Sequence, residues 1–288
     1  MATGCDDDDI TDPFDDVDEP RLAFASNRDG DFEIYTMESD GSNVVQLTTD
    51  NSADNNPTWR GDGDFIAFTS TRTGNSDIWI MEADGSDQAN VTANIGNDDH
   101  PSFSPDGDQI VFTSDRDGDF DLYIINTDGT GLRQLTDVAG IDNWPSWSPD
   151  GDEIVFSSTR AGSAGADIWI MEADGTGTPV QLTTEAGTDN QPSWSADGDK
   201  IAYSTVRAGN IEIFTMDPDG TDKVNATNSV GADTQPAYSG HTFFDVLSIF
   251  AWTSTRDAVT GEIYVMDDTG ASIRLTNNTF TDENPSFK

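Results

Sequence analysis

The sequence has few of the features typical of redox, membrane-spanning or nucleic-acid-binding proteins. It contains one cysteine, Cys5, so no disulfide can form within the chain. No run of about 18 apolar residues occurs, so no transmembrane helix is expected. Only 13 residues are Lys or Arg, against 55 Asp and Glu, and the formal net charge is −42. Because phosphate contacts need clustered basic side chains, nucleic acid and anionic membrane surfaces are excluded as direct partners.

The excess of acidic residues has two readings. One is a solvated, halophilic surface on which counterions screen the repulsion between carboxylates. The other is a protein that binds divalent cations. The two readings can hold for different subsets of the carboxylates, and both are kept.

Residues 1–20 differ in composition from the rest of the chain. The segment 6–20 reads DDDDITDPFDDVDEP and contains no basic residue, which is typical of a disordered tether. The residues before it, Ala2-Thr3-Gly4-Cys5, are similar to the end of a bacterial lipobox, in which small residues precede a cysteine that becomes lipidated. We therefore expect an acidic tether with a candidate lipid anchor at Cys5.

The rest of the chain is a repeat with a period of 44 to 49 residues. Prolines that have an aspartate three positions earlier mark the period, at Pro57, Pro101, Pro145, Pro192, Pro236 and Pro285. Arginines mark it again, at Arg28, Arg72, Arg116, Arg160, Arg207 and Arg256. A period of this length is typical of a propeller blade.

Each unit predicts four short antiparallel strands. Aromatic residues recur after the proline, before the arginine and in the third strand, as at Trp147, Phe156 and Trp169, and Asp-Gly turns join the strands. The first unit lacks its proline segment, and the last residues, Asp282 to Phe287, supply it. We therefore predict an all-β, six-bladed propeller over residues 21–288, with aromatics packed between blades and the C-terminal strand completing the first blade.

The repeats resemble the WD40-like PD40 repeats of TolB-type six-bladed propellers. The motif PSWSPDG stands at 145–151, DIWIMEADG at 77–85 and 167–175, and QLT at 46–48 and 181–183. The resemblance covers residues 21–288 and implies the propeller fold. It also implies a role among those of such propellers, which serve in periplasmic envelope complexes, as gating domains of peptidases or as stand-alone lipoproteins.

The repeat arginines are six of the 13 basic residues, and an acidic residue follows each of them by five to seven positions. Because arginine forms bidentate pairs with carboxylates, we predict a structural ion pair within each blade. The predicted partners are Glu33, Asp77, Asp121, Asp167, Glu212 and Glu262. Binding of an anion or a substrate carboxylate is the alternative role.

The aspartates three residues before the prolines form a second ring, consisting of Asp54, Asp98, Asp142, Asp189, Asp233 and Asp282. They precede the innermost strands, so we expect them at one mouth of the central channel. Converging carboxylates repel one another unless a cation lies among them, and calcium prefers oxygen ligands. Additional candidate ligands are the following residues Asn55, Asp99, Asn143, Asn190 and Glu283. Asx-turns that only organise the loops explain the same pattern.

No catalytic residues are predicted, because the two histidines, His100 and His241, lie in different units. His100 follows Asp98-Asp99 and is placed to reach the channel. The predicted function is a non-enzymatic, monomeric, extracytoplasmic scaffold, periplasmic or at the cell surface, that holds calcium and binds an envelope protein or a small ligand. Two alternatives remain: a calcium-dependent hydrolase or lactonase at the channel mouth, and a salt-adapted interaction module without a specific ion.

Overall fold

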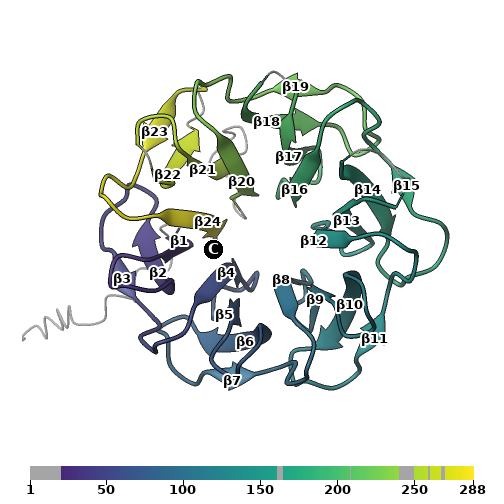
Figure 1. The fold of residues 1–288 in the computed structure, drawn as a ribbon, viewed down its shortest axis with the longest axis horizontal. Coiled ribbons are helices and arrows are strands. Elements are labelled where there is room, and N and C mark those ends of the chain that lie inside the picture. The colour runs from purple at the N-terminus through teal and green to yellow at the C-terminus, as the bar shows by residue number, and fades with distance from the viewer. Residues whose placement is uncertain (1–20, 161–164, 208, 240–249, 259, 267–269) are drawn as a thin grey trace, which may run out of the picture.

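A computed structural model describes residues 21–160, 165–207, 209–239, 250–258, 260–266 and 270–288. The predicted tether 1–20 with Cys5 lies outside these residues, as does His241. Six four-stranded antiparallel sheets surround a central axis (Figure 1). The predicted six-bladed propeller is therefore confirmed. Among the described residues no helix is long and apolar enough to cross a membrane.

The four strands of a blade follow one another from the axis outward. The innermost strands are β24 (Asp282–Phe287), β4 (Asp54–Trp59), β8 (Asp98–Phe103), β12 (Asp142–Trp147), β16 (Asp189–Trp194) and β20 (Asp233–Tyr238). The second strands are β1 (Arg21–Ser26), β5 (Phe65–Ser70), β9 (Gln109–Ser114), β13 (Glu153–Ser158), β17 (Ile201–Val206) and β21 (Phe250–Ser254). The third strands are β2 (Glu33–Glu38), β6 (Asp77–Glu82), β10 (Asp121–Asn126), β14 (Asp167–Glu172), β18 (Ile211–Met216) and β22 (Glu262–Met266).

The outermost strands are shorter: β3 (Val45–Gln46), β7 (Ala89–Asn90), β11 (Arg133–Gln134), β15 (Val180–Gln181), β19 (Val224–Asn225) and β23 (Ser272–Arg274). Short edge strands offer few unpaired backbone groups to another chain. Tight turns join the strands, and glycine holds the left-handed position in the Asp-Gly turns, as at Gly107 (φ 73°) and Gly151 (φ 80°).

The ring closes as predicted. The C-terminal strand β24 pairs antiparallel with β1, so the yellow C-terminal end lies beside the purple first strand in Figure 1. Leu22 lies opposite Phe287, and the Lys288 N–H donates to the Arg21 carbonyl at 2.8 Å. Closure leaves the first blade with the same four strands as the others and gives the channel an inner strand from every blade.

The hydrophobic core lies between adjacent blades. Leu22 and Phe24 of the first blade pack with Ala251 and Ile263 of the last, and similar clusters fill the other junctions. The aromatic residue four positions before each repeat arginine is fully buried, with Phe24, Phe68, Phe112, Phe156, Tyr203 and Trp252 all at 0% exposure. The prediction that these aromatics form the contacts between blades is confirmed.

Candidate functional site in the central channel

Each repeat arginine binds the ring aspartate of its own blade. Arg116 Nη2 donates to both carboxylate oxygens of Asp98 at 2.9 Å. The same salt bridge joins Arg28 to Asp282, Arg72 to Asp54, Arg160 to Asp142, Arg207 to Asp189 and Arg256 to Asp233. The strand register places the two partners together, because Asp98 lies opposite Ser114 and the arginine follows that serine by two residues.

Serines and aromatic rings hold the guanidinium groups in place. Arg116 Nε donates to Ser114 Oγ at 2.9 Å, and its guanidinium carbon lies 4.7 Å from the ring centre of Tyr123. The arrangement repeats in the other blades, except that Thr205 replaces the serine beside Arg207, whose Nε has no partner among the described residues. Cation–π contacts add to an ion pair in a partly desolvated site.

The partners predicted for the arginines are therefore corrected. The guanidinium group packs against the aromatic ring of the third strand but forms its ion pair with the ring aspartate of the innermost strand. Threonines of the outer connections bind the acids at the start of the third strand, as where Thr136 Oγ1 donates to Asp121 at 2.9 Å and Thr227 Oγ1 donates to Glu212 at 2.7 Å. Among the described residues, no salt bridge to an arginine is recorded for Glu33, Asp77, Asp121 or Glu212, while Glu262 pairs with Arg274.

The ring aspartates lie inside the blades. All six are 0% exposed, and each carboxylate accepts from its arginine. Burial raises the pKa of Asp54 and Asp98, while hydrogen bonds from a serine and the arginine oppose that shift. Among the described residues, the ligand atoms that lie close enough together for a metal belong to Asp117, Asp121 and Asp137. Calcium at the ring aspartates stays a prediction.

A different ring of six residues faces the channel. These residues follow the ring aspartates by two positions and directly precede the repeat prolines. All six have left-handed backbone conformations, with φ between 52° and 57°: Asn56, His100, Trp144, Gln191, Gln235 and Asn284. We call these six residues the channel ring.

A bulge in each innermost strand produces this conformation. Between Asp99 and Ser102, β8 advances three residues while β9 moves only from Thr113 to Val111. The same shift occurs in the other five innermost strands. An extra residue bends a strand and turns its side chain away from the sheet. The proline that follows disfavours the right-handed helical conformation at this position, and it has no N–H of its own to pair.

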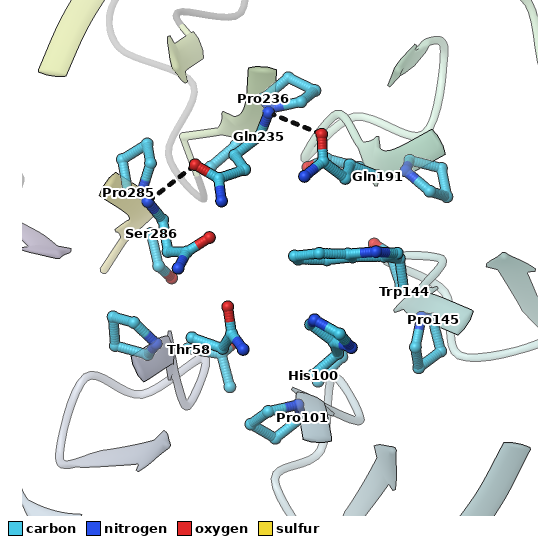
Figure 2. Close-up of a pocket in the computed structure, with 18 residues that line it drawn as sticks. Thr58, His100, Pro101, Trp144, Pro145, Gln191, Gln235, Pro236, Pro285 and Ser286 are labelled. Atoms are coloured by element: carbon cyan, nitrogen blue, oxygen red, sulfur yellow. Dashed lines mark hydrogen bonds between the residues drawn. The ribbon is translucent and has the colours of Figure 1, made fainter. Parts of the chain in front are cut away.

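The channel ring, the prolines and the residues after them line a cavity of about 150 Å³. Figure 2 shows the labelled side chains of His100, Trp144, Gln191 and Gln235 directed toward the middle of this cavity. Hydrogen bonds connect neighbouring blades, because Gln191 Oε1 accepts from the Gln235 N–H at 3.1 Å and Gln235 Oε1 accepts from the Asn284 N–H at 3.2 Å. The glutamines are thereby fixed in orientation.

His100 and Trp144 form an aromatic pair on the opposite side of the cavity. Their ring centres are 3.5 Å apart, and Figure 2 shows the imidazole against the indole. Burial lowers the pKa of His100, so the imidazole is neutral at pH 7, and the nearby Asp99 carboxylate opposes that shift. His100 Nδ1 is buried and has no hydrogen-bond partner among the described residues.

A second cavity, of about 270 Å³, shares Asn56, Trp144, Gln235 and Asn284 with the first. Three of the additional calcium ligands predicted from the sequence line it: Asn55, Asp99 and Glu283. Asn143 instead connects its blade to the preceding one, because its Oδ1 accepts from Thr113 of β9 at 2.9 Å and also from the Trp144 N–H at 2.8 Å. Asn190 lies in β16, where its carbonyl accepts from Ser204 at 3.1 Å.

Of the six members of the channel ring, only His100 is a candidate from the sequence alone. Their positions carry a detectable signal, because they always directly precede the repeat proline. The residue type at this position differs between units (Asn, His, Trp, Gln, Gln and Asn). The residue two positions earlier is always aspartate, and the residue one position later is always proline. Variation at a position that lies between an unvarying aspartate and an unvarying proline marks a surface that is free to acquire specificity.

The fold and the repeat define the class of protein, a six-bladed β-propeller built from PD40-type units. The PD40 family, described as the TolB beta propeller domain, matches residues 13–100 and 88–174, together more than half of the chain. The chain therefore belongs to this family. No curated protein matches it in sequence.

Several solved structures share the fold. TolB from Acinetobacter baumannii is 22% identical with a TM-score of 0.79, and the match covers 93% of this chain and 66% of that one. This chain thus spans just under two thirds of that TolB. The putative TolB from Agrobacterium tumefaciens is 20% identical with a TM-score of 0.74, covering 92% and 91%. A chain of the nidogen/laminin complex is 11% identical with a TM-score of 0.73, covering 93% and 98%. At these identities the likeness establishes the fold alone.

Proposed function

We propose that this propeller is a binding scaffold whose ligand contacts the channel ring. The observation that carries the proposal is the left-handed backbone at all six positions of the ring. Outside glycine this conformation costs about 1–2 kcal/mol per residue. Asn56, Asn284 and His100 are of types that adopt it more readily than most, whereas Trp144 and the two glutamines are not. Backbone strain of this kind clusters at binding and active sites.

The remaining parts of the molecule support a scaffold. The Asp–Arg pairs and the aromatic core are repeated in every blade, and they hold the inner strands at fixed positions around the axis. One structure with the same fold is a complex of nidogen with laminin, which agrees with a propeller that binds a partner. The calcium predicted at the ring aspartates is a finer form of the proposal, and such an ion has to compete with an arginine at each carboxylate.

We place the scaffold outside the cytoplasm, by analogy with the periplasmic roles of TolB-type propellers. The lipobox-like Ala2-Thr3-Gly4-Cys5 and the acidic composition support this placement. Metabolic labelling of the producing cells with palmitate tests it. Label is expected on the wild-type chain and not on Cys5→Ala, and equal absence from both contradicts the anchor.

Ligand-observed NMR with a fragment library of acids, amides, amines and alcohols tests the binding site. Fragments that bind the wild-type protein are expected to lose binding to Trp144→Ala and His100→Ala. They should still bind Val180→Ala, in which the substitution lies on the exposed outer strand β15. Fragments that bind all four proteins equally place the binding surface elsewhere and contradict the proposal.

A further inference from the structure

The second cavity is lined by groups that accept hydrogen bonds. Asp99 and Glu283 contribute carboxylates, and Asn55 and Asn284 contribute amide oxygens. The Oδ1 atoms of both asparagines are buried and have no partner among the described residues, and Asn284 is only 8% exposed. A buried acceptor without a donor loses its hydration without compensation. The cavity therefore favours a ligand that brings donors.

Glu283 adds an uncompensated negative charge. The side chain is half-buried, and no hydrogen bond or ion pair to its carboxylate is recorded among the described residues. Asp99 accepts three hydrogen bonds on one oxygen, from Asn56, Thr69 and the His100 N–H, at 2.7, 2.7 and 2.9 Å. No hydrogen bond to its other oxygen is recorded in the part of the chain that the structure describes. Neither cavity has a lysine or arginine among its described lining residues.

An aromatic surface stands beside these carboxylates. Trp144 lines both cavities, and the imidazole of His100 supports its indole. The electron-rich face of an indole attracts cations, most strongly where water is excluded. The net charge of −42 attracts cations toward the molecule as a whole.

From this juxtaposition we infer that the second cavity binds a small organic cation, with its ammonium or guanidinium group between the Trp144 indole and the carboxylates of Asp99 and Glu283. The inference rests on the proposed function and names the class of ligand. A divalent metal is disfavoured here, because the cavity has two carboxylates and the one close group of three found among the described residues, Asp117, Asp121 and Asp137, lies elsewhere.

The test titrates n-butylammonium and the neutral n-butanol into the protein at a fixed, physiological salt concentration. The readout is the 1H–15N signal of the Trp144 indole, assigned with Trp144→Phe. The amine is expected to shift this signal with saturation, and the alcohol is not. Glu283→Gln and Trp144→Ala should each weaken amine binding about tenfold, measured by calorimetry.

A matched control separates the site from the general field of the protein. Glu172→Gln removes one charge, like Glu283→Gln, but lies on an exposed position of β14 and should leave the affinity unchanged. Equal weakening in both variants, equal binding of n-butanol, or a larger indole shift with calcium than with the amine overturns the inference. Neutral or acidic fragments that bind at Trp144 while the amine does not leave the proposed function standing. No response of Trp144 to any fragment contradicts both.

Discussion

Two rings of residues surround the same channel, and their members lie two positions apart in the sequence. The rings differ in which property is the same in all six blades. The ring aspartates are the same residue in all six blades, fully buried and paired with arginine. The channel ring keeps the same backbone conformation but has four different residue types. The first ring therefore maintains the shape of the blade. The second presents side chains that differ from blade to blade on that constant frame.

The residue four positions before the ring aspartate differs between blades: it is an asparagine in two blades and an acid in two others, Asp50 and Glu185. Asn94 Nδ2 donates to Asp98 at 2.5 Å, and Asn278 Nδ2 donates to Asp282 at 2.6 Å. The corresponding residue before Asp54 is the acid Asp50, which cannot donate when ionised. One oxygen of Asp50, one of Asp54 and one of the nearby Glu33 are consequently buried without partners. The junction between the first two blades thus holds more uncompensated negative charge than the others.

The largest effect is expected from breaking an aspartate–arginine pair. Asp98→Asn keeps the shape of the side chain but leaves Arg116 without its anionic partner, and removing one member of a buried pair costs about 3–5 kcal/mol. Urea denaturation should show a loss of about 3 kcal/mol. Asp99→Asn, at the next residue along the chain, is the control. It should lower the free energy of unfolding by less than about 1 kcal/mol.

The same pair of variants tests calcium at the ring. If Asp98 served chiefly as a calcium ligand, the melting temperature of the wild-type protein would rise with millimolar calcium at fixed ionic strength, and that rise would be lost in Asp98→Asn. We expect Asp98→Asn to be less stable whether or not calcium is present.

The second-largest effect is a dependence of the protein's stability on pH, which originates at the junction between the first two blades. Burial, with Asp54, Asp50 and Asp31 nearby, raises the pKa of Glu33 to about 8, from 4.5 for a free side chain, although the hydrogen bond with Thr48 opposes the shift. The folded protein therefore binds a proton that the unfolded chain releases. This contribution to stability is fully present below pH 4.5 and is lost as the pH rises through 8.

Between pH 8.5 and 6.5 the Glu33 proton should increase the free energy of unfolding by about 2 kcal/mol. Thermal melting of the wild type and Glu33→Gln at constant ionic strength measures this contribution. On acidification the stability of the wild type should increase more than that of the variant, because the other acids titrate equally in both proteins. Parallel pH profiles would show that Glu33 titrates normally.

The fold was predictable because the sequence contains six copies of the same unit. Each copy repeats the alternation of strands and the aromatic positions, so an error in one copy is corrected by the other five. The orphan segment from Asp282 to Phe287 further specified how the ring closes. The repeat arginines were also predicted to form structural ion pairs, but spacing along the chain favoured the acids of the third strands over the ring aspartates. The return of Arg116 toward Asp98 depends on a turn conformation that spacing does not encode.

The channel ring was less predictable for a related reason. Its members share a backbone conformation and not a residue type, and a bulge is not visible in a sequence pattern of alternating polar and apolar residues. Trp144 is of the same residue type as the tryptophans in the core, although its side chain faces the channel. Only the alignment of all six pre-proline positions separates it from Trp147, which packs in the core.

The third effect repairs the junction between the first two blades. Asp50→Asn supplies the amide that Asn94 and Asn278 provide elsewhere, and it removes one of three clustered carboxylates. The gain from a hydrogen bond to a charged acceptor should exceed the loss of the partly exposed Asp50–Arg72 contact at 2.8 Å, because Arg72 keeps Asp54. We expect an increase of about 1.5 kcal/mol in urea denaturation. The reverse change, Asn94→Asp, should destabilise the next blade, and a loss of stability in Asp50→Asn would refute the comparison.

The smallest effect concerns the strain in the channel ring. Trp144→Gly and Trp144→Ala both remove the indole, so the difference between them reports the backbone. At a φ of 54° the glycine variant should be more stable than the alanine variant by about 1 kcal/mol. At Ser102, which lies in β8 and has no positive φ, the order should be reversed, because glycine loses more conformational entropy on folding. Denaturation of these four variants measures both differences. If glycine were not favoured at Trp144, the ring would be unstrained, and the main argument for a binding surface in the channel would fail.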